Sequence, residues 1–226
     1  VRAGQATWTA LKSGQMGTAD QPVNDSCGTL PGSRGAPVGF FDEDPFSLGA
    51  DLAYLTHGHQ EAAHAAGAFA VVIHSLLRNG SLDFGVQQAV RRLDDARDRE
   101  LAVRLCDAYL WGRQRPDAGA VRERYPNPRR AGNALCLAVL SAARAVDGRA
   151  LRGDGWDGPE TADEYSAAHR SVRSMRGQLL GCISGSAQLP DTPLGRELDR
   201  IVTRLAGDVE TEFREDDEWW RAYPGW

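Results

Sequence analysis

The chain has 226 residues and a formal net charge of −5, and 42% of its residues are hydrophobic and 25% charged. These proportions are typical of a soluble globular protein and exclude a fibrous or wholly disordered one. We expect a single domain over residues 1–226. Nucleic acid is not an expected partner, because affinity for a phosphate backbone comes from clustered positive charge. No apolar run approaches the roughly 20 residues that span a bilayer, and no signal-like segment opens the chain, so we expect a cytoplasmic protein without a membrane partner.

Apolar residues recur at helical spacing along most of the chain, and no run of alternating β-branched residues indicates a strand. We therefore expect an all-α protein. The clearest predicted helix covers residues 59–77, with one apolar stripe, and Asn79-Gly80 ends it. The other predicted helices, in chain order, cover residues 46–55, 82–95, 99–111, 132–146, 162–184 and 194–213. Residues 115–129 and 148–160 are predicted loops.

Residues 21–39 form one long irregular segment rich in Gly, Pro, Asn and Ser. A loop of that length in a compact helical domain is commonly functional, and we expect it to be ordered beside His57. Within it, residues 24–28 and 32–35 offer backbone N–H groups, and Arg34 adds a fixed cation. Such a loop can wrap a diphosphate. The alternative is a plain connector rich in turns.

Two other sets of residues could carry metal or redox chemistry. Leu55-Thr-His-Gly-His59 contains two histidines, but no carboxylates at suitable spacing accompany them. We expect a histidine here to cap the following helix or to bind an anion at its N-terminus. The cysteines contain no CxxC pair and are predicted to be buried free thiols: Cys27, Cys106, Cys136 and Cys182.

Several short motifs occur in an order that covers nearly the whole chain. They are Pro22-Val-Asn-Asp-Ser-Cys27, Arg34-Gly-Ala-Pro-Val-Gly-Phe-Phe41, Leu55-Thr-His-Gly-His59, Asn133-Ala-Leu135, Gly177-Gln-Leu-Leu-Gly181, Leu189-Pro190 and Glu218-Trp-Trp-Arg-Ala-Tyr-Pro-Gly-Trp226. In this order they resemble the bacterial ADP-ribosylglycohydrolases of the dinitrogenase-reductase-activating type. The resemblance implies an orthogonal helical bundle, and this sequence would begin after the family's opening helices.

The resemblance also implies a binding site for ADP-ribose. Arg34 would anchor the ligand and His57 would contact a phosphate. The loop around the ribose and diphosphate would contain Asn24, Ser26, Cys27 and Gly28. The family has glycines where this chain has Leu30 and Pro31, and a proline removes an N–H donor. The expected partner is an ADP-ribose-like small molecule or an ADP-ribosylated protein; another protein or a second copy of the chain is also considered.

The metal site that the resemblance implies is altered. The family holds two magnesium ions with an acidic cluster near its N-terminus and an Asp-x-Asp motif, whose carboxylates suit this ion. The two aspartates fall at Ala168 and Arg170, and the first cluster has no counterpart in this sequence. An Asp-to-Arg change turns attraction into repulsion of roughly 4 kcal/mol per charge pair at close range. We expect no metal cofactor, and we expect Arg170 to lie in the former metal site with reduced exposure and an acid or anion as partner. The alternative is that Arg170 faces water.

Four functions remain open. The protein could be a non-catalytic binder of ADP-ribose or of a protein partner, or a hydrolase whose missing ligands come from another segment or chain. It could also be a metal-free enzyme that uses His169 or Arg170, or a protein without a ligand. The C-terminal aromatic residues are expected to pack on the core: Trp219, Trp220, Tyr223 and Trp226.

Overall fold

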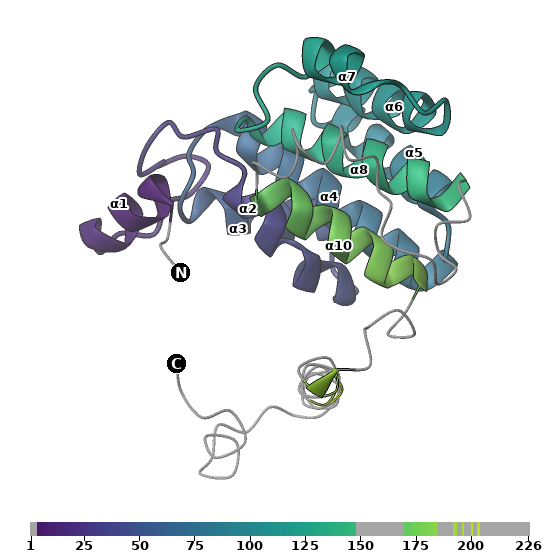
Figure 1. Ribbon diagram of the computed structural model, residues 1–226. Coiled ribbons are helices and arrows are strands. Elements are labelled where there is room, and N and C mark those ends of the chain that lie inside the picture. Colours follow the sequence, from purple (N-terminus) through teal and green to yellow (C-terminus); the bar gives the residue numbers. More distant parts are fainter. Residues whose placement is uncertain are drawn as a thin grey trace. The chain divides into compact units, whose positions relative to one another are not determined.

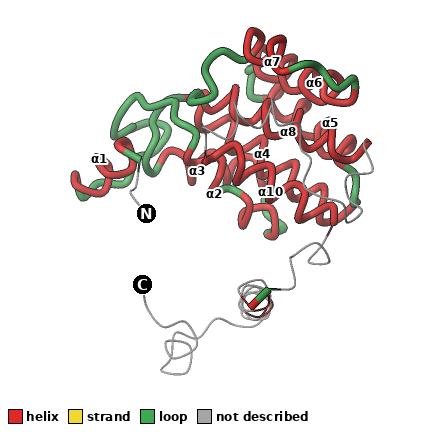
Figure 2. The backbone as a smooth tube through the Cα atoms, viewed as in Figure 1, coloured by secondary structure: helices red, strands yellow, loops and turns green. Residues whose placement is uncertain are grey.

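The computed structural model describes residues 4–147 and 170–184, together with Thr192, Pro193, Arg196, Arg200 and Thr203. The regular structure of these residues is helical, as the tube in Figure 2 shows, and the one bridge of β type joins Gly28 and Arg130. The all-α prediction is therefore confirmed. The chain divides into two compact units, Val1–Gly185 and Ser186–Trp226. The helices below belong to the first unit, and a single domain over residues 1–226 stays a prediction.

Figure 1 shows the helices of this unit in their places. In chain order they are α1 (Gln5–Ser13), α2 (Leu30–Arg34), the 3-10 helix η1 (Ala36–Phe40), α3 (Pro45–Tyr54), α4 (Gln60–Asn79), α5 (Leu82–Asp95), α6 (Arg99–Arg113), α7 (Ala118–Arg124), α8 (Ala131–Asp147) and α10 (Arg170–Ser184). No described helix is both long enough and apolar enough to cross a bilayer.

Helix α4 is the centre of the unit. It packs against α3, α5, α8 and α10 and against the short α2 and η1 (Figure 1). Most of its residues are buried, and many of these are Ala or Gly, which lets neighbours approach closely. A Cβ atom at Gly67 would lie only 2.5 Å from the carbonyl oxygen of Phe46 in α3. The helix begins after His59, and Gly80 ends it in the left-handed conformation, with φ of 64°.

Side-chain oxygen atoms cap the starts of four helices. Asp44, Ser81, Asp98 and Asp117 each accept a hydrogen bond from a backbone N–H in the first turn of α3, α5, α6 and α7. These N–H groups have no partner inside the helix, so the caps stabilise each start. For α3, α5 and α6, the predicted bounds lie close to the observed ones.

Four helical segments were not predicted. Helix α1 was missed, α7 lies in the predicted loop 115–129, and α2 and η1 lie in the predicted irregular segment 21–39. Pro31 stands in the first turn of α2, where a backbone N–H has no helical partner. Its missing donor therefore costs the helix nothing.

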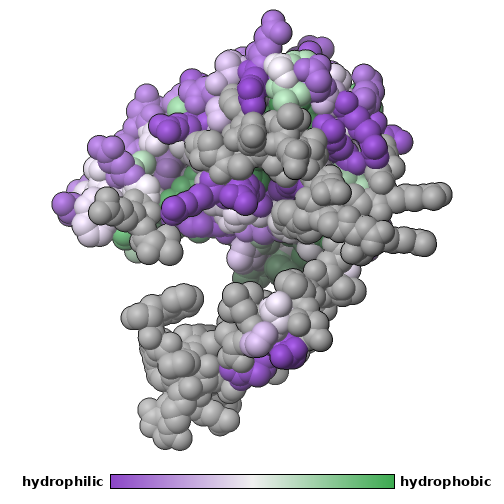
Figure 3. Space-filling view, viewed as in Figure 1, coloured by the Kyte–Doolittle hydropathy of each residue, from purple (hydrophilic) through white to green (hydrophobic). Residues whose placement is uncertain are grey.

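The last two described helices close the core. The buried side chains of α8 include Leu135, Leu137 and Leu140, and α10 adds Met175 and Leu179. Helix α10 packs against α8, α4 and α2. On the face seen in Figure 3, hydrophilic side chains cover most of the described surface of this unit. Residues 162–169 of the predicted helix 162–184, most of the predicted helix 194–213 and the C-terminal aromatic residues lie outside the described residues.

Candidate functional site

Asn24 fastens the loop of residues 21–29 to the segment that precedes α4. Its Nδ2 donates to the carbonyl oxygen of Thr56 at 2.9 Å, and its Oδ1 accepts from the N–H of Gly58 at 3.3 Å. A Cβ atom at Gly28 would lie 3.1 Å from Nε2 of His57, so the loop backbone rests on the imidazole. The expectation of an ordered loop beside His57 agrees with this geometry.

The far end of the loop is attached to the start of α8. The carbonyl oxygen of Cys27 accepts from the N–H of Ala131 at 2.9 Å, and Gly28 forms its bridge with Arg130. Arg130 in turn forms an ion pair with Glu61, whose Oε1 also accepts from the N–H of Gly132 at 3.2 Å. The loop is therefore held by the segment that precedes α4 and by the start of α8.

Two of the backbone amides that were expected to face a ligand are used inside the loop. The N–H of Ser26 donates to Oδ1 of Asn24 at 2.9 Å, and the N–H of Gly28 donates to Oγ of Ser26 at 3.3 Å. At these two positions the prediction of an open cradle of free amides is wrong. Asn and Ser side chains form such local turns readily, and they satisfy these donors before a ligand can.

Arg34 brings the fixed charge of the site. Its side chain is half-buried at the end of α2, and its Nη2 donates to the hydroxyl of Thr56 at 2.7 Å. Its Nε is shielded from solvent and has no hydrogen-bond partner, and no described acid pairs with the guanidinium. Burial lowers the pKa of Arg34 below its ordinary value. A buried cation without a counter-ion is costly, so this environment favours an anion.

His57 is buried and neutral beside this cation. Burial first, and then the charge of Arg34, lower its pKa from 6.5 to about 4. Its Nδ1 lies 2.9 Å from the Thr56 hydroxyl, which already accepts from Arg34. Because the Thr56 oxygen accepts from Nη2 of Arg34, its own hydrogen is free to be donated to Nδ1 of His57. In that arrangement Nε2 carries the imidazole hydrogen and can donate to an anion.

The structure brings together Asn24, Ser26, Cys27, Gly28, Arg34 and His57, but it does not support the prediction for Arg170. Arg170 is the first residue of α10 and is exposed, and it has no hydrogen bond or ion pair with the described residues. The prediction of reduced exposure is therefore wrong, and an acid or anion partner stays a prediction. A charged side chain at the first turn of a helix extends into water unless a neighbour compensates its burial. Ala168 and His169 lie outside the described residues.

The donor set of the described residues does not fit a divalent metal. No group of three His, Cys, Asp or Glu side chains gathers there, and a guanidinium such as that of Arg170 is no ligand. The neighbouring histidines use their Nδ1 atoms elsewhere: that of His59 accepts from the N–H of Glu61, and that of His64 lies 2.8 Å from Asp98. The first of these confirms a histidine as the N-cap of α4.

All four cysteines are free thiols, as predicted, but only Cys136 is fully buried. Burial raises its pKa to about 12, so it stays a thiol. Sequence analysis did not single out Thr56, Glu61 or Arg130. The threonine stands inside a recognised motif, whereas nothing in the sequence places Glu61 against a residue 69 positions later.

A helical unit with an ordered loop, a half-buried arginine and a neutral histidine has the kind of site that suits an anionic ligand. The family model described as ADP-ribosylglycohydrolase matches residues 1–218. The chain belongs to the ADP-ribosylglycohydrolase family. No curated protein and no solved structure matches it significantly.

Proposed function

We propose that this chain binds ADP-ribose, or a closely related diphosphate, at Arg34 and His57 and does not hydrolyse it by itself. The ligand would be a free small molecule or the modification carried by an ADP-ribosylated protein. Nucleic acid and membranes are not part of the proposal. Family membership supports the ligand class, and the site supports an anion.

The observation that carries the proposal is the environment of Arg34. Its guanidinium is half-buried, its described partner is the neutral hydroxyl of Thr56, and its Nε lacks a partner. A phosphate oxygen would offset the cost of burying this charge and satisfy the remaining donors, because Arg binds phosphate through its planar fork. Nε2 of His57 would add a neutral donor beside it.

The non-catalytic part of the proposal rests on the residues at the positions of the family's metal ligands. Ala168 and Arg170 stand where the resemblance puts two aspartates, and Arg170 is exposed. We therefore assign no metal cofactor and derive no hydrolytic step. The second candidate is a hydrolase whose metal ligands come from another segment or chain, and the family match favours it.

Calorimetry with ADP-ribose in the absence of divalent ions tests the binding. We expect Arg34→Met to weaken the affinity about 10- to 100-fold, the value of a hydrogen bond to a charged group. Arg34→Lys keeps the positive charge but loses the planar fork of donors, so its affinity for ADP-ribose should lie between those of the wild type and Arg34→Met. Arg91→Met, which removes an exposed arginine of α5, is the control and should leave the affinity unchanged.

Release of ADP-ribose from an ADP-ribosylated protein, with and without magnesium, tests catalysis. We expect no turnover by the purified chain in either condition. Turnover that needs magnesium would establish the second candidate instead. If wild-type protein does not bind ADP-ribose at all, the binding half of the proposal is wrong.

A further inference from the structure

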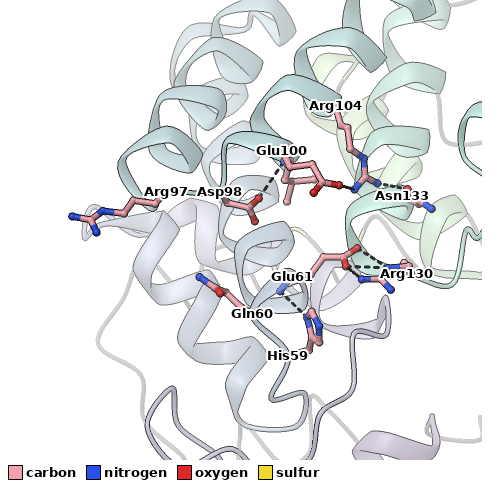
Figure 4. A pocket seen from close by; sticks show the side chains of 10 residues that line it. His59, Gln60, Glu61, Arg97, Asp98, Glu100, Arg104, Arg130 and Asn133 are labelled. Atoms are coloured by element: carbon pink, nitrogen blue, oxygen red, sulfur yellow. Dashed lines mark hydrogen bonds and ion pairs between the residues drawn. The ribbon is translucent and has the colours of Figure 1, made fainter.

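A separate cavity lies where α4, α6 and α8 begin, and Figure 4 shows its lining. Its volume is about 430 Å³, which is within the range of small-molecule sites. Charged and amide side chains form nearly all of the described wall, and Leu101 contributes apolar surface. None of Asn24, Arg34 and His57 lines it, so this cavity is not the site proposed above.

Two of the acids in the wall already have hydrogen-bond partners within the protein. Glu61 accepts from the Arg130 guanidinium and from the N–H of Gly132. Asp98 accepts from the N–H of Leu101 at 3.1 Å and lies 2.8 Å from Nδ1 of His64. Both carboxylates therefore accept hydrogen bonds from the fold itself.

Arg104 pairs with an exposed acid of this wall, Glu100. Its side chain is only 29% exposed, and it hydrogen-bonds to the neutral Oδ1 of Asn133 (Figure 4). The Nδ2 of Asn133 donates to the carbonyl oxygen of Asn127 at 2.9 Å, which fixes the orientation of the amide. The nearest carboxylate is that of Glu100, at 3.6 Å, and this side chain is 84% exposed at the rim. An ion pair with so exposed an acid is weak, so an anion inside the cavity can replace Glu100 as the partner of Arg104.

His59 adds a neutral donor to the same wall. A backbone N–H can only donate, so the bond from Glu61 to Nδ1 of His59 places the imidazole hydrogen on Nε2. The three helices that begin here contribute partial positive charge as well. Several donors on different elements suit a tetrahedral phosphate better than a planar carboxylate, which offers two oxygens.

We propose that this cavity binds a phosphate monoester of up to about nucleotide size, independently of the Arg34 site. The phosphate lies against Arg104 and Nε2 of His59, and the amides of Gln60 and Asn133 contact the remainder of the ligand. The cavity is much larger than a phosphate group, so inorganic phosphate binds more weakly than a nucleotide. In Figure 4 the side chain of Arg97 points away from the other residues, and it has no part in the proposal.

Thermal unfolding of the whole chain with AMP, inorganic phosphate or adenosine tests this site, because a ligand of the folded state raises the melting temperature with its concentration. We expect AMP and phosphate to stabilise the protein, AMP at lower concentration, and adenosine to have no effect. Arg104→Met should lower the affinity for AMP at least about 10-fold. Glu100→Gln removes the exposed acid that competes with phosphate for Arg104, so it should increase the affinity for AMP about 2- to 3-fold.

Arg34→Met separates the two proposed sites. It should leave the effect of AMP on this cavity intact even if ADP-ribose binding is lost. If Arg104→Met fails to fold, the response of Glu100→Gln decides. The proposal is overturned if AMP and phosphate do not stabilise the protein or if adenosine acts as well as AMP. It is equally overturned if Glu100→Gln leaves AMP binding unchanged or if Arg34→Met abolishes it.

Discussion

The hydroxyl oxygen of Thr56 lies 2.7 Å from Nη2 of Arg34, and it connects this cation to Nδ1 of His57, 2.9 Å away on its other side. The carbonyl oxygen of the same threonine accepts from Asn24. One small residue therefore joins α2, the loop and the segment that leads into α4. The predictions below begin with it.

Thr56→Val removes the hydroxyl but keeps the shape of the side chain. Arg34 then loses its described acceptor and His57 loses the partner of Nδ1, so we expect the free energy of unfolding to fall by about 1–3 kcal/mol. Urea denaturation measures the change. Thr56→Ser retains the hydroxyl and should lose less than about 1 kcal/mol. Equal losses in the two variants would show that the methyl group, not the hydrogen bonds, matters here.

The low pKa of His57 predicts a pH dependence of stability. The folded protein protonates this imidazole only near pH 4, whereas the unfolded chain does so near 6.5. Between these two pH values the unfolded state binds a proton that the folded state does not. The contribution of neutral His57 to the free energy of unfolding is therefore complete above pH 6.5 and is lost as the pH falls toward 4. The loss should approach about 3 kcal/mol.

Urea denaturation at a series of pH values checks this dependence. His57→Gln should flatten the curve between pH 4 and 6.5, since glutamine does not titrate. Arg34→Met removes the second cause of the shift and should flatten it in part. A His57→Gln protein with the full wild-type slope would contradict the assignment to His57.

Gly58→Ala should destabilise the loop contact. A methyl group at Gly58 would overlap the carbonyl oxygen of Asn24, so the loop must move away. We expect a loss of about 2 kcal/mol or more, as for overpacking of a tight contact, together with weaker ADP-ribose binding. Gly177→Ala in α10 is the matched control, because a Cβ atom there meets nothing within 4 Å. It should be neutral or stabilise the helix by up to about 1 kcal/mol, and both changes are measurable by thermal unfolding.

Arg97→Gly should stabilise the protein. Arg97 has φ of 61° just after α5, and its N–H and that of Asp98 donate to Asp94 and Leu93 in the bonding pattern of a helix C-terminus. Glycine adopts this conformation without strain, so we expect a gain of about 0.5–1 kcal/mol in urea denaturation. Arg97→Ala keeps the strain and should gain less. A gain from alanine as large as that from glycine would mean that the arginine charge, not its backbone, is unfavourable.

The helical nature of the chain and most of its helix bounds could be predicted from sequence. Apolar spacing identifies α4, and caps such as Ser81 and Asp98 act within a few residues of where they stand. Short helices were missed because α2 and α7 span too few residues for a periodic pattern to develop. Pro31, which looked like a break, instead stands where a helix tolerates proline.

The sequence by itself indicated which loop and which histidine belong together, since Asn24, Arg34 and His57 all lie in motifs that resemble those of the family. Tertiary structure alone decided what those residues do. The amides of Ser26 and Gly28 donate to neighbouring side chains, Arg170 is exposed, and Arg34 is half-buried without an acid partner among the described residues. Helical periodicity and capping depend on residues a few positions apart, whereas burial and hydrogen-bond partners depend on which distant segments pack together, so only the folded chain sets the charge state and the free donors of the site.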